Sequence, residues 1–235
     1  MAAEAHSTAT LRLTVGDLRI VHPITVPSGR VAAVEVVPAL QGLVNAVVEA
    51  AEAASARSGA AISCRKGCGA CCRQLVPVSR TEGERLLALV RSLPPERRER
   101  LTARFAAAES TIENAGLAKR AGQSDRELSL AYFALGLPCP FLEDESCSIH
   151  PDRPLVCREY LVTSPAELCA GPAQEGVTPV AVPKVSMAAR GLQDDGEDWF
   201  PLALLMKWAR TRPRSDKRRT GPEWVQRFLG AFKGA

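Results

Sequence analysis

Aromatic residues are scarce in this chain, and neither sign of charge dominates it. Phe, Trp and Tyr make up 5% of the 235 residues, and the formal net charge is +4. A net charge of this size does not indicate a polyanionic partner. The basic stretch 210–219 has no interleaved aromatic residues on which bases could stack, so we interpret it as a solvated linker. We therefore expect no nucleic-acid partner.

Motifs of several enzyme classes are also missing. The sequence contains no Walker loop, no dinucleotide-binding fingerprint and no Ser/His/Asp arrangement. It has three histidines, and two of them, His6 and His22, lie in the N-terminal segment. Hydrolytic chemistry at a histidine-rich metal site is therefore not expected.

The chain shows no targeting signal or membrane span by sequence pattern. Residues 1–10 lack the basic start and the apolar run of a secretory signal. The most apolar stretch, 31–51, is interrupted by two glutamates, a proline and an asparagine, and so falls short of a membrane span. We expect a cytoplasmic protein without a membrane partner.

Cysteine, in contrast, is abundant: four of the eight cysteines fall within nine residues. The stretch 64–72 reads CRKGCGACC, with the spacing C-x3-C-x2-C-C. Basic neighbours keep it polar, whereas a cysteine that only fills a core lies among apolar residues. Disulfides are rare in a reducing cytosol, and glycine lets the backbone wrap tightly around a metal. We therefore predict metal ligands at Cys64, Cys68, Cys71 and Cys72.

Cys71 and Cys72 are adjacent, and this constrains the metal centre. Neighbouring side chains point in different directions on a helix or a strand, so these two thiols are not expected to bind one tetrahedral ion side by side. Either one thiol is spare or the centre holds more than one metal atom. We favour the second alternative because the rest of the chain supplies more cysteines.

A second cysteine group lies between residues 138 and 160. Polar residues 143–146 between short apolar pieces predict a hairpin-like turn, and prolines on both sides argue against a long helix. A loop segment of this kind needs something other than backbone ladders to hold it, and a metal is the simplest candidate. This group adds three predicted ligands, Cys139, Cys147 and Cys157.

The rest of the sequence predicts a helical scaffold. Alternating apolar residues in 11–37 predict a short edge hairpin, limited by two prolines, that turns near Gly16-Asp17. Pro38 begins an amphipathic helix that ends near Gly59. Further helices are expected from the capping boxes Thr81-x-x-Glu84 and Ser124-x-x-Glu127, from Pro95, from Asp198 and from Pro222, with a loop and a short strand near Val180.

The predicted fold class is therefore mainly α, with a loop-built cysteine-rich metal site and a small N-terminal β hairpin. We divide the chain into an N-terminal extended segment, a cysteine-cluster metal-binding domain, and C-terminal loops and helices that pack on the same domain. These are residues 1–37, 38–170 and 171–235.

Three motifs in this order make residues 60–165 resemble the bacterial YkgJ-type cysteine-cluster family. The motifs are Cys64-x3-Cys68-Gly69-x-Cys71-Cys72, Pro138-Cys139-Pro140-Phe141-Leu142, and Cys147-Ser148-Ile149-His150-x2-Arg153-Pro154-x2-Cys157-Arg158-x-Tyr160. Because that family is described as zinc- or iron-chelating, the resemblance implies metal chelation through the cysteines. His150 stands where family members often carry tyrosine, and Cys169 lies outside the signature, so neither is among the predicted ligands.

Seven signature thiols exceed the four that one zinc ion or one cubane cluster requires. Thiolates accept zinc, copper(I) and iron–sulfur units alike. The irregular spacing with adjacent cysteines favours an iron–sulfur or polynuclear centre over a simple zinc knuckle. Arg158, next to a predicted ligand, is the candidate cofactor-binding residue. It is one of five basic residues expected to favour thiolate, with Arg65, Lys66, Arg73 and Arg153.

Three hypotheses of function follow, the first being a metal-binding module. The second is a protein-modifying enzyme, because the resembling family includes the flagellin lysine N-methylase, which looks like an iron–sulfur, S-adenosylmethionine-dependent enzyme with a protein substrate. The third is a thiol redox switch at Cys71-Cys72 or Cys169. The spacing C-x3-C-x2-C also matches radical S-adenosylmethionine enzymes, but a helix rather than a strand precedes it, and no strand–helix alternation follows.

Overall fold

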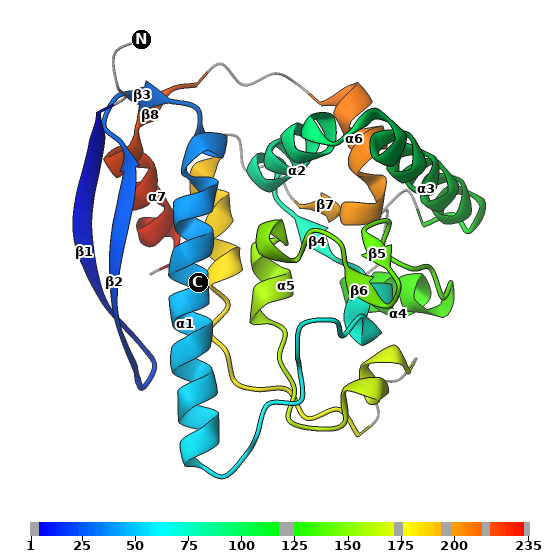
Figure 1. Ribbon diagram of the computed structural model, residues 1–235, viewed down its shortest axis with the longest axis horizontal. Helices are drawn as coiled ribbons and strands as arrows, with labels where there is room; N and C mark the ends of the chain where they lie inside the picture. The colour runs from blue at the N-terminus through cyan, green and yellow to red at the C-terminus, as the bar shows by residue number, and fades with distance from the viewer. Residues whose placement is uncertain (1–4, 118–124, 172–175, 194–198, 213–216, 233–235) are drawn as a thin grey trace.

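The computed structural model describes residues 5–117, 125–171, 176–193, 199–212 and 217–232. It confirms the predicted fold class: helices dominate, and the one long strand pair among the described residues is the N-terminal hairpin. Figure 1 shows this hairpin and α7 on one side of α1, and the cysteine-bearing elements with α2, α3 and α6 on the other.

The N-terminal hairpin is longer than the sequence predicted. Strand β1 (His6–Val15) pairs antiparallel with β2 (Leu18–Pro27) around Gly16, whose φ of +56° lies in the left-handed region that favours glycine. Pro23 and Pro27 do not shorten β2, because each strand of a two-stranded ribbon has an outer edge that needs no N–H donor. The buried face of β2 lies against α1.

Helix α1 (Val37–Arg57) begins with a proline in its first turn and is followed by Gly59 at a φ of +81°, as predicted. A short 3₁₀ helix, η1 (Ala33–Val36), precedes it. The predicted apolar stripe of α1 is buried, at Leu40, Leu43, Val44, Val47 and Val48. By length and composition alone, Ala33–Arg57 could cross a membrane, so the sequence-based exclusion of such a stretch was too strong. Its apolar stripe is nevertheless accounted for by packing inside the protein.

C-terminal elements complete the core around α1. Helix α7 (Gly221–Phe232) starts at the predicted position, and strand β3 (Arg30–Val31) pairs with β8 (Arg219–Thr220) just before it. The 3₁₀ helix η5 (Val185–Leu192) packs against α7. The sequence assigned this segment to a loop, because its glycine and proline content hid a short apolar face. Val180 forms no strand of its own, and the nearest pairing is an isolated bridge between Val162 and Pro179.

A second set of helices surrounds the contact between Phe105 and Phe141, whose ring centroids lie 5.3 Å apart in an edge-on arrangement. The elements are β4 (Pro77–Val78), α2 (Arg80–Ser92), α3 (Pro95–Asn114), α4 (Asp125–Ala134), β7 (Phe200–Pro201), η6 (Leu202–Leu204) and α6 (Leu205–Thr211). Strands β4 and β7, which lie far apart in the sequence, pair antiparallel within this set.

The predicted helix starts are confirmed at Pro95 but not at Thr81. The capping box of α2 is formed by Ser79 and Glu82, two residues earlier than the sequence indicated. The predicted caps Ser124 and Asp198 lie outside the described residues. The segments that contain the cysteines form loops and short elements. The short elements are η2 (Ala70–Arg73), β5 (Leu142–Glu143), β6 (Ser146–Cys147), η3 (His150–Asp152), α5 (Leu155–Glu159) and η4 (Ala166–Ala170).

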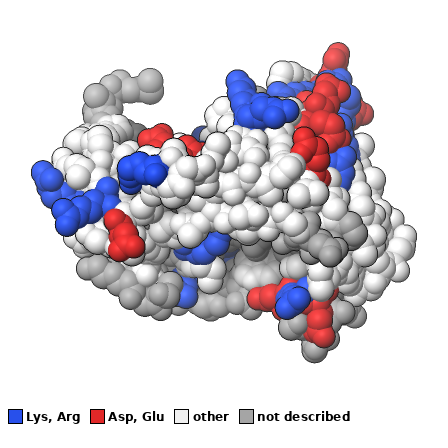
Figure 2. Space-filling model, turned by 90° about the horizontal axis from the view of Figure 1, so that it is seen from below, with Lys and Arg blue, Asp and Glu red and all other residues white. Residues whose placement is uncertain are grey.

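Charged side chains are unevenly distributed on the face shown in Figure 2. They gather toward the two ends of the molecule, while the middle of this face is largely uncharged. Acidic and basic side chains are intermixed at both ends, and on the described atoms of this face we see no broad patch of one sign. This agrees with the small net charge of the chain.

Candidate metal centre

The first cysteine group is a loop tied to the segment that follows α5. The N–H of Ser63 donates to the carbonyl of Val162 (2.9 Å), and its Oγ donates to that of Thr163 (3.0 Å), so Cys64 starts from a fixed point. Gly67, with a φ of +90°, then turns the chain. The loop ends in η2, which carries the adjacent Cys71 and Cys72.

The second group begins on the predicted hairpin. Strands β5 and β6 are joined by Asp144 and Glu145, which have φ values of 48° and 54°. Two successive residues with positive φ are typical of a type I′ turn. The turn places Cys147 opposite Leu142 in the register. The sequence therefore predicted this hairpin correctly.

The two cysteine groups are in direct contact. The N–H of Cys139 donates to the carbonyl of Cys72 (2.7 Å), and the Arg73 guanidinium donates to both carboxylate oxygens of Glu145 (3.0 and 2.7 Å). Glu145 is mostly exposed, so this pair adds little stability. Its geometry nevertheless sets the first loop against the hairpin turn.

Gly69 permits the closest approach between the two groups. A Cβ atom at this position would lie 2.5 Å from the carbonyl oxygen of Glu145 and 2.5 Å from Cδ1 of Leu142. Backbone cannot yield to such a contact without moving one loop away from the other. The glycine is thus required by packing, not by its own dihedral angles.

We expect Gly69→Ala to destabilise the protein by about 1–3 kcal/mol, the usual cost of overpacking. It should also weaken metal binding, because it separates the loops that carry the predicted ligands. The matched control is Gly230→Ala, since a Cβ at Gly230 meets no atom within 4 Å. Gly230 lies in α7, so its replacement by alanine should leave stability unchanged or raise it slightly. Urea unfolding of wild type and both variants checks this, and a wild-type midpoint for Gly69→Ala would show that the loops are not in tight contact.

Thiols from both groups lie close enough to Cys71 for its charge to affect their pKa. A hydrogen bond with the Cys72 thiol, followed by burial, raises the pKa of Cys71 above its ordinary value. Burial raises the pKa of Cys139 to about 12, with smaller contributions from the charges of Cys147 and Cys71. Burial also raises the pKa of Cys157, as do the charges of Cys139, Cys71 and Cys147. These four thiols therefore share one electrostatic environment.

Cys64 and Cys169 are also affected by charges of the first group. Burial raises the pKa of each thiol, and the charges of Cys71 and Cys68 add to the effect. Cys169, only 3% exposed, is held beside the first loop because Gln74 donates to its carbonyl (3.4 Å) and Tyr160 hydrogen-bonds to its thiol. Sequence reasoning left Cys169 out of the predicted ligands, and its spacing alone could not have placed it here.

The side chains nevertheless do not form a finished coordination shell. Within the described ranges, no three His, Cys, Asp or Glu side chains are grouped so as to hold a metal ion. The eight cysteines are all free thiols. As donors they suit soft metals, because thiolate is the binding form and binding releases protons. Metal loading would require the neighbouring thiols to rotate toward a shared centre.

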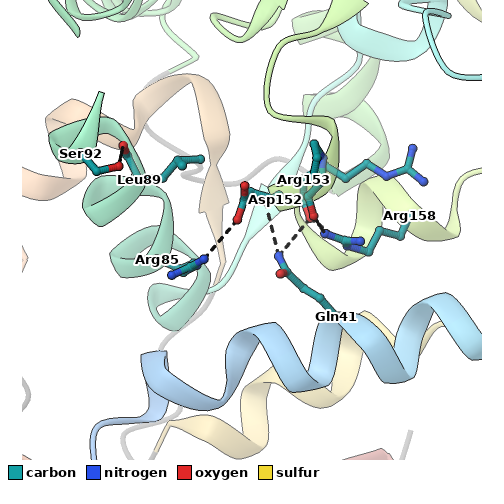
Figure 3. Close-up of polar contacts among 8 residues, drawn as sticks. Gln41, Arg85, Leu89, Ser92, Asp152, Arg153 and Arg158 are labelled. Atoms are coloured by element: carbon teal, nitrogen blue, oxygen red, sulfur yellow. Dashed lines mark hydrogen bonds and ion pairs between the residues drawn. The ribbon is translucent and has the colours of Figure 1, made fainter. Parts of the chain in front are cut away.

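Arg158, the predicted cofactor-binding residue, is engaged elsewhere. It is 4% exposed, and its Nε, Nη1 and Nη2 donate to Arg153 O (3.0 Å), Asn45 Oδ1 (2.9 Å) and Pro151 O (2.5 Å). Figure 3 shows this side chain between α5, α1 and the loop that precedes α5. Burial lowers its pKa to about 10. Each of its guanidinium nitrogens therefore has a protein partner.

Buried Glu82 connects α2 to the segment that carries Cys157. Its Oε2 accepts from the N–H (3.1 Å) and Oγ (2.8 Å) of Ser79, and its Oε1 accepts from the N–H of Leu155 (2.9 Å). One carboxylate thus caps the start of α2 and also fixes the start of α5. Burial raises its pKa despite these hydrogen bonds and the nearby charge of Arg158.

We predict a pH dependence of stability from Glu82. Because its pKa is higher in the folded than in the unfolded chain, its contribution to the free energy of unfolding is largest below pH 4.5 and is lost as the pH rises through the folded pKa. Urea unfolding of wild type and Glu82→Gln should give a difference that shrinks with rising pH. A difference that does not vary with pH would contradict this origin.

A helical scaffold that gathers thiols from two loop groups defines a cysteine-cluster metal-binding domain. Residues 63–175 match the model of the family CxxCxxCC, described as "Putative zinc- or iron-chelating domain". The matched segment contains all eight cysteines, including Cys169. The family resemblance of the sequence is therefore confirmed. No curated protein and no solved structure matches the chain.

Proposed function

We propose that this protein is a cytoplasmic metal-binding protein that holds iron, as an iron–sulfur or polynuclear centre, through both cysteine groups. The observation that carries the proposal is the direct contact between the two cysteine groups, in which the N–H of Cys139 donates to the carbonyl of Cys72 (2.7 Å). The influence of the Cys71 charge on thiols of both groups supports it. Zinc is the alternative metal, because thiolates bind both.

The number of neighbouring thiols favours a centre with more than one metal atom. A single tetrahedral zinc ion uses four ligands. Cys71 affects the pKa of five other thiols, and one such ion cannot bind this many. Four of them belong to the two groups and the fifth is Cys169; the five are Cys64, Cys139, Cys147, Cys157 and Cys169.

An open hollow beside the first group offers a route to the thiols. Its volume is about 500 Å³, and Cys68 lies on its wall together with charged residues of both signs. A metal ion or a small metal complex could reach Cys68 from solvent without any helix moving. The charged residues on the wall are Arg65, Arg73, Glu145 and Glu167.

Anaerobic purification with elemental analysis, acid-labile sulfide assay and visible spectroscopy tests the proposal. We expect iron, with a broad visible absorption that bleaches on oxidation if the centre is an iron–sulfur cluster. Stoichiometric zinc without visible absorption would show that the bound metal is zinc and not iron. Protein that retains neither metal and takes up neither on reconstitution would overturn the proposed function.

The hydrogen bond between the Cys71 and Cys72 thiols supports a second candidate, a thiol redox switch. In that case a mild oxidant would join the two sulfurs, releasing two protons and two electrons, in protein free of metal. Thiol titration before and after oxidation tests this. If thiols become accessible only after chelation of a bound metal, the redox switch is excluded and the metal-binding function remains.

A methylase-like activity would additionally require S-adenosylmethionine binding, which calorimetry on the anaerobic protein can detect.

A further inference from the structure

Strand β1 has an outer edge with which no strand of the described residues pairs. The N–H of Ser28 donates to the carbonyl of Ala5 (2.8 Å), and these two residues lie opposite each other where the β1–β2 register continues beyond the strands. Hydrogen-bonded pairs alternate along an antiparallel ladder, so the odd-numbered residues of β1 bond to β2. The even-numbered residues therefore direct their N–H and C=O groups away from β2. Figure 1 shows β1 at the margin of the molecule, with β2 between it and α1.

The two outer edges of the hairpin differ in their ability to pair. Pro23 and Pro27 lie opposite even-numbered residues of β1, and thus on the outer edge of β2, which lacks these N–H donors and cannot extend a regular ladder. Strand β1 has no proline, no lysine and no bulge in its register, which are common devices that keep an edge from pairing. Four of its outward-directed residues are exposed, and β1 is therefore the open edge of the hairpin. They are Thr8, Thr10, Arg12 and Thr14.

The apolar side of β1 is also incompletely covered. Leu11 and Leu13 pack against the core around α1 but are only half-buried. Ile20 and Ile24 of β2, on the same side of the hairpin, are 3% and 4% exposed. The core thus ends at β1 with apolar surface still in contact with water. A further strand beside β1 would remove part of this surface from water, which is favourable.

We propose that β1 pairs with β1 of a second copy of this chain, antiparallel about a twofold axis at Thr10, in a homodimer with a continuous four-stranded sheet. The charges of the strand are compatible with this register. Arg12 is the only Lys, Arg, Asp or Glu residue of β1, and it comes to lie opposite the uncharged Thr8 of the second copy. Like charges therefore do not face each other. No run of charge on this edge would select an acidic or a basic peptide instead.

The other cross-strand pairs of this register also fit. Thr10 lies opposite Thr10 of the second copy, where the two hydroxyl groups can hydrogen-bond. On the inner side, Leu11 lies opposite Ala9 of the second copy, so a large residue meets a small one. The same patch serves both copies, as a twofold interface requires.

This dimer is independent of the proposed function. The hairpin lies on one side of α1 and the cysteine-bearing elements lie on the other (Figure 1). Pairing through β1 therefore leaves both cysteine groups, and the hollow beside Cys68, uncovered. We expect one chain of the dimer to bind as much metal as a monomer does.

Sedimentation velocity of the full chain over a range of concentrations tests the proposal, in a reducing buffer that prevents disulfides between chains. We expect a monomer–dimer equilibrium for the wild type. Thr10→Pro should weaken the dimer about 10–100-fold, because both hydrogen bonds exchanged by the two Thr10 residues lose their donors. Thr10 lies opposite Pro23 and does not bond to β2, so the hairpin itself should keep its ladder. Thr10→Val is the matched control, since it keeps the N–H and a β-branched side chain and should dimerise as the wild type does.

Thr8→Glu tests the register. It places a carboxylate opposite Arg12 of the second copy, and the dimer should become about 2–10-fold tighter. A wild type that is monomeric at every concentration would overturn the dimer, and equal dimerisation of wild type and Thr10→Pro would show that another surface forms it. If Thr10→Pro does not fold, a dimer of unchanged affinity in Thr8→Glu would overturn the proposed register. Metal content measured on the same samples is a separate readout, because its absence would overturn the proposed function and not the dimer.

Discussion

Replacing Cys71 by serine is expected to abolish most metal binding. The charge of Cys71 influences thiols of both cysteine groups, so this thiol lies where the groups meet. Loss of a residue that only orients a ligand costs about 10–100-fold in metal affinity, so loss of a ligand shared by both groups should cost more than about 100-fold. Metal content after anaerobic reconstitution and Zn²⁺ competition measure the effect.

Cys72→Ser is the matched control for Cys71→Ser. The two residues are adjacent in η2, and a serine at either site makes the same small change to the local backbone. Cys72 contacts the second group through its carbonyl oxygen, which accepts from the N–H of Cys139 and is unaffected by the substitution. We therefore expect Cys72→Ser to keep more metal than Cys71→Ser. If the two variants lose metal equally, both thiols are ligands, and the centre depends on their adjacency.

This contrast shows what the sequence could and could not predict about the site. Spacing indicated that the cysteines act together and that adjacent thiols do not share one ion. It could not predict which of Cys71 and Cys72 matters more for metal binding, because that depends on how the first loop packs against the second cysteine group. That arrangement depends on Gly69, whose missing Cβ lets the first loop reach the carbonyl of Glu145. Nothing in the local sequence of Gly69 distinguishes it from Gly67, which serves a turn.

The fold was predictable where the signal was local and repeated. The hairpin, α1 and the start of α3 follow from alternation, helical periodicity and prolines. The start of α2 was wrong because Ser79-x-x-Glu82 and Thr81-x-x-Glu84 fit the same capping pattern. The structure selects the first, since Glu82 also accepts from the N–H of distant Leu155. A partner this far along the chain is invisible to a window of a few residues.

The same limitation applies to the two arginines beside Cys157. Arg158 adjoins a predicted ligand and Arg153 does not, so sequence reasoning preferred Arg158. In the fold, Asn45 of α1 and two carbonyls of the preceding loop take up the donors of Arg158. Arg153 is left with a buried Nε that has no described partner. Asn45, the residue of α1 that accepts a hydrogen bond from Arg158, lies more than a hundred positions earlier in the chain.

Arg158→Met is accordingly expected to destabilise the protein, by about 2–4 kcal/mol. The change leaves three acceptors without this donor, Asn45 Oδ1, Pro151 O and Arg153 O, in a region where the arginine is only 4% exposed. A buried polar group that loses its partner costs about 1–3 kcal/mol. The total for three acceptors is smaller than three times this cost for two reasons. Arg153 O still accepts a hydrogen bond from Gln41. Removing a buried cation also recovers part of the free energy that its desolvation costs. Urea unfolding at constant metal content measures the change.

The control for this prediction is Arg104→Met, which removes an arginine with a similar pattern of contacts in a more exposed place. Arg104 Nη1 donates to the carbonyls of Pro140 (3.2 Å) and Leu142 (3.0 Å), but its side chain is 45% exposed, so water can replace it. Arg104→Met should therefore cost less than about 1 kcal/mol. Equal unfolding midpoints for the two variants would show that Arg158 does not hold the loop to α1. A large loss confined to Arg158→Met would show that this arginine holds the loop that precedes α5 against α1.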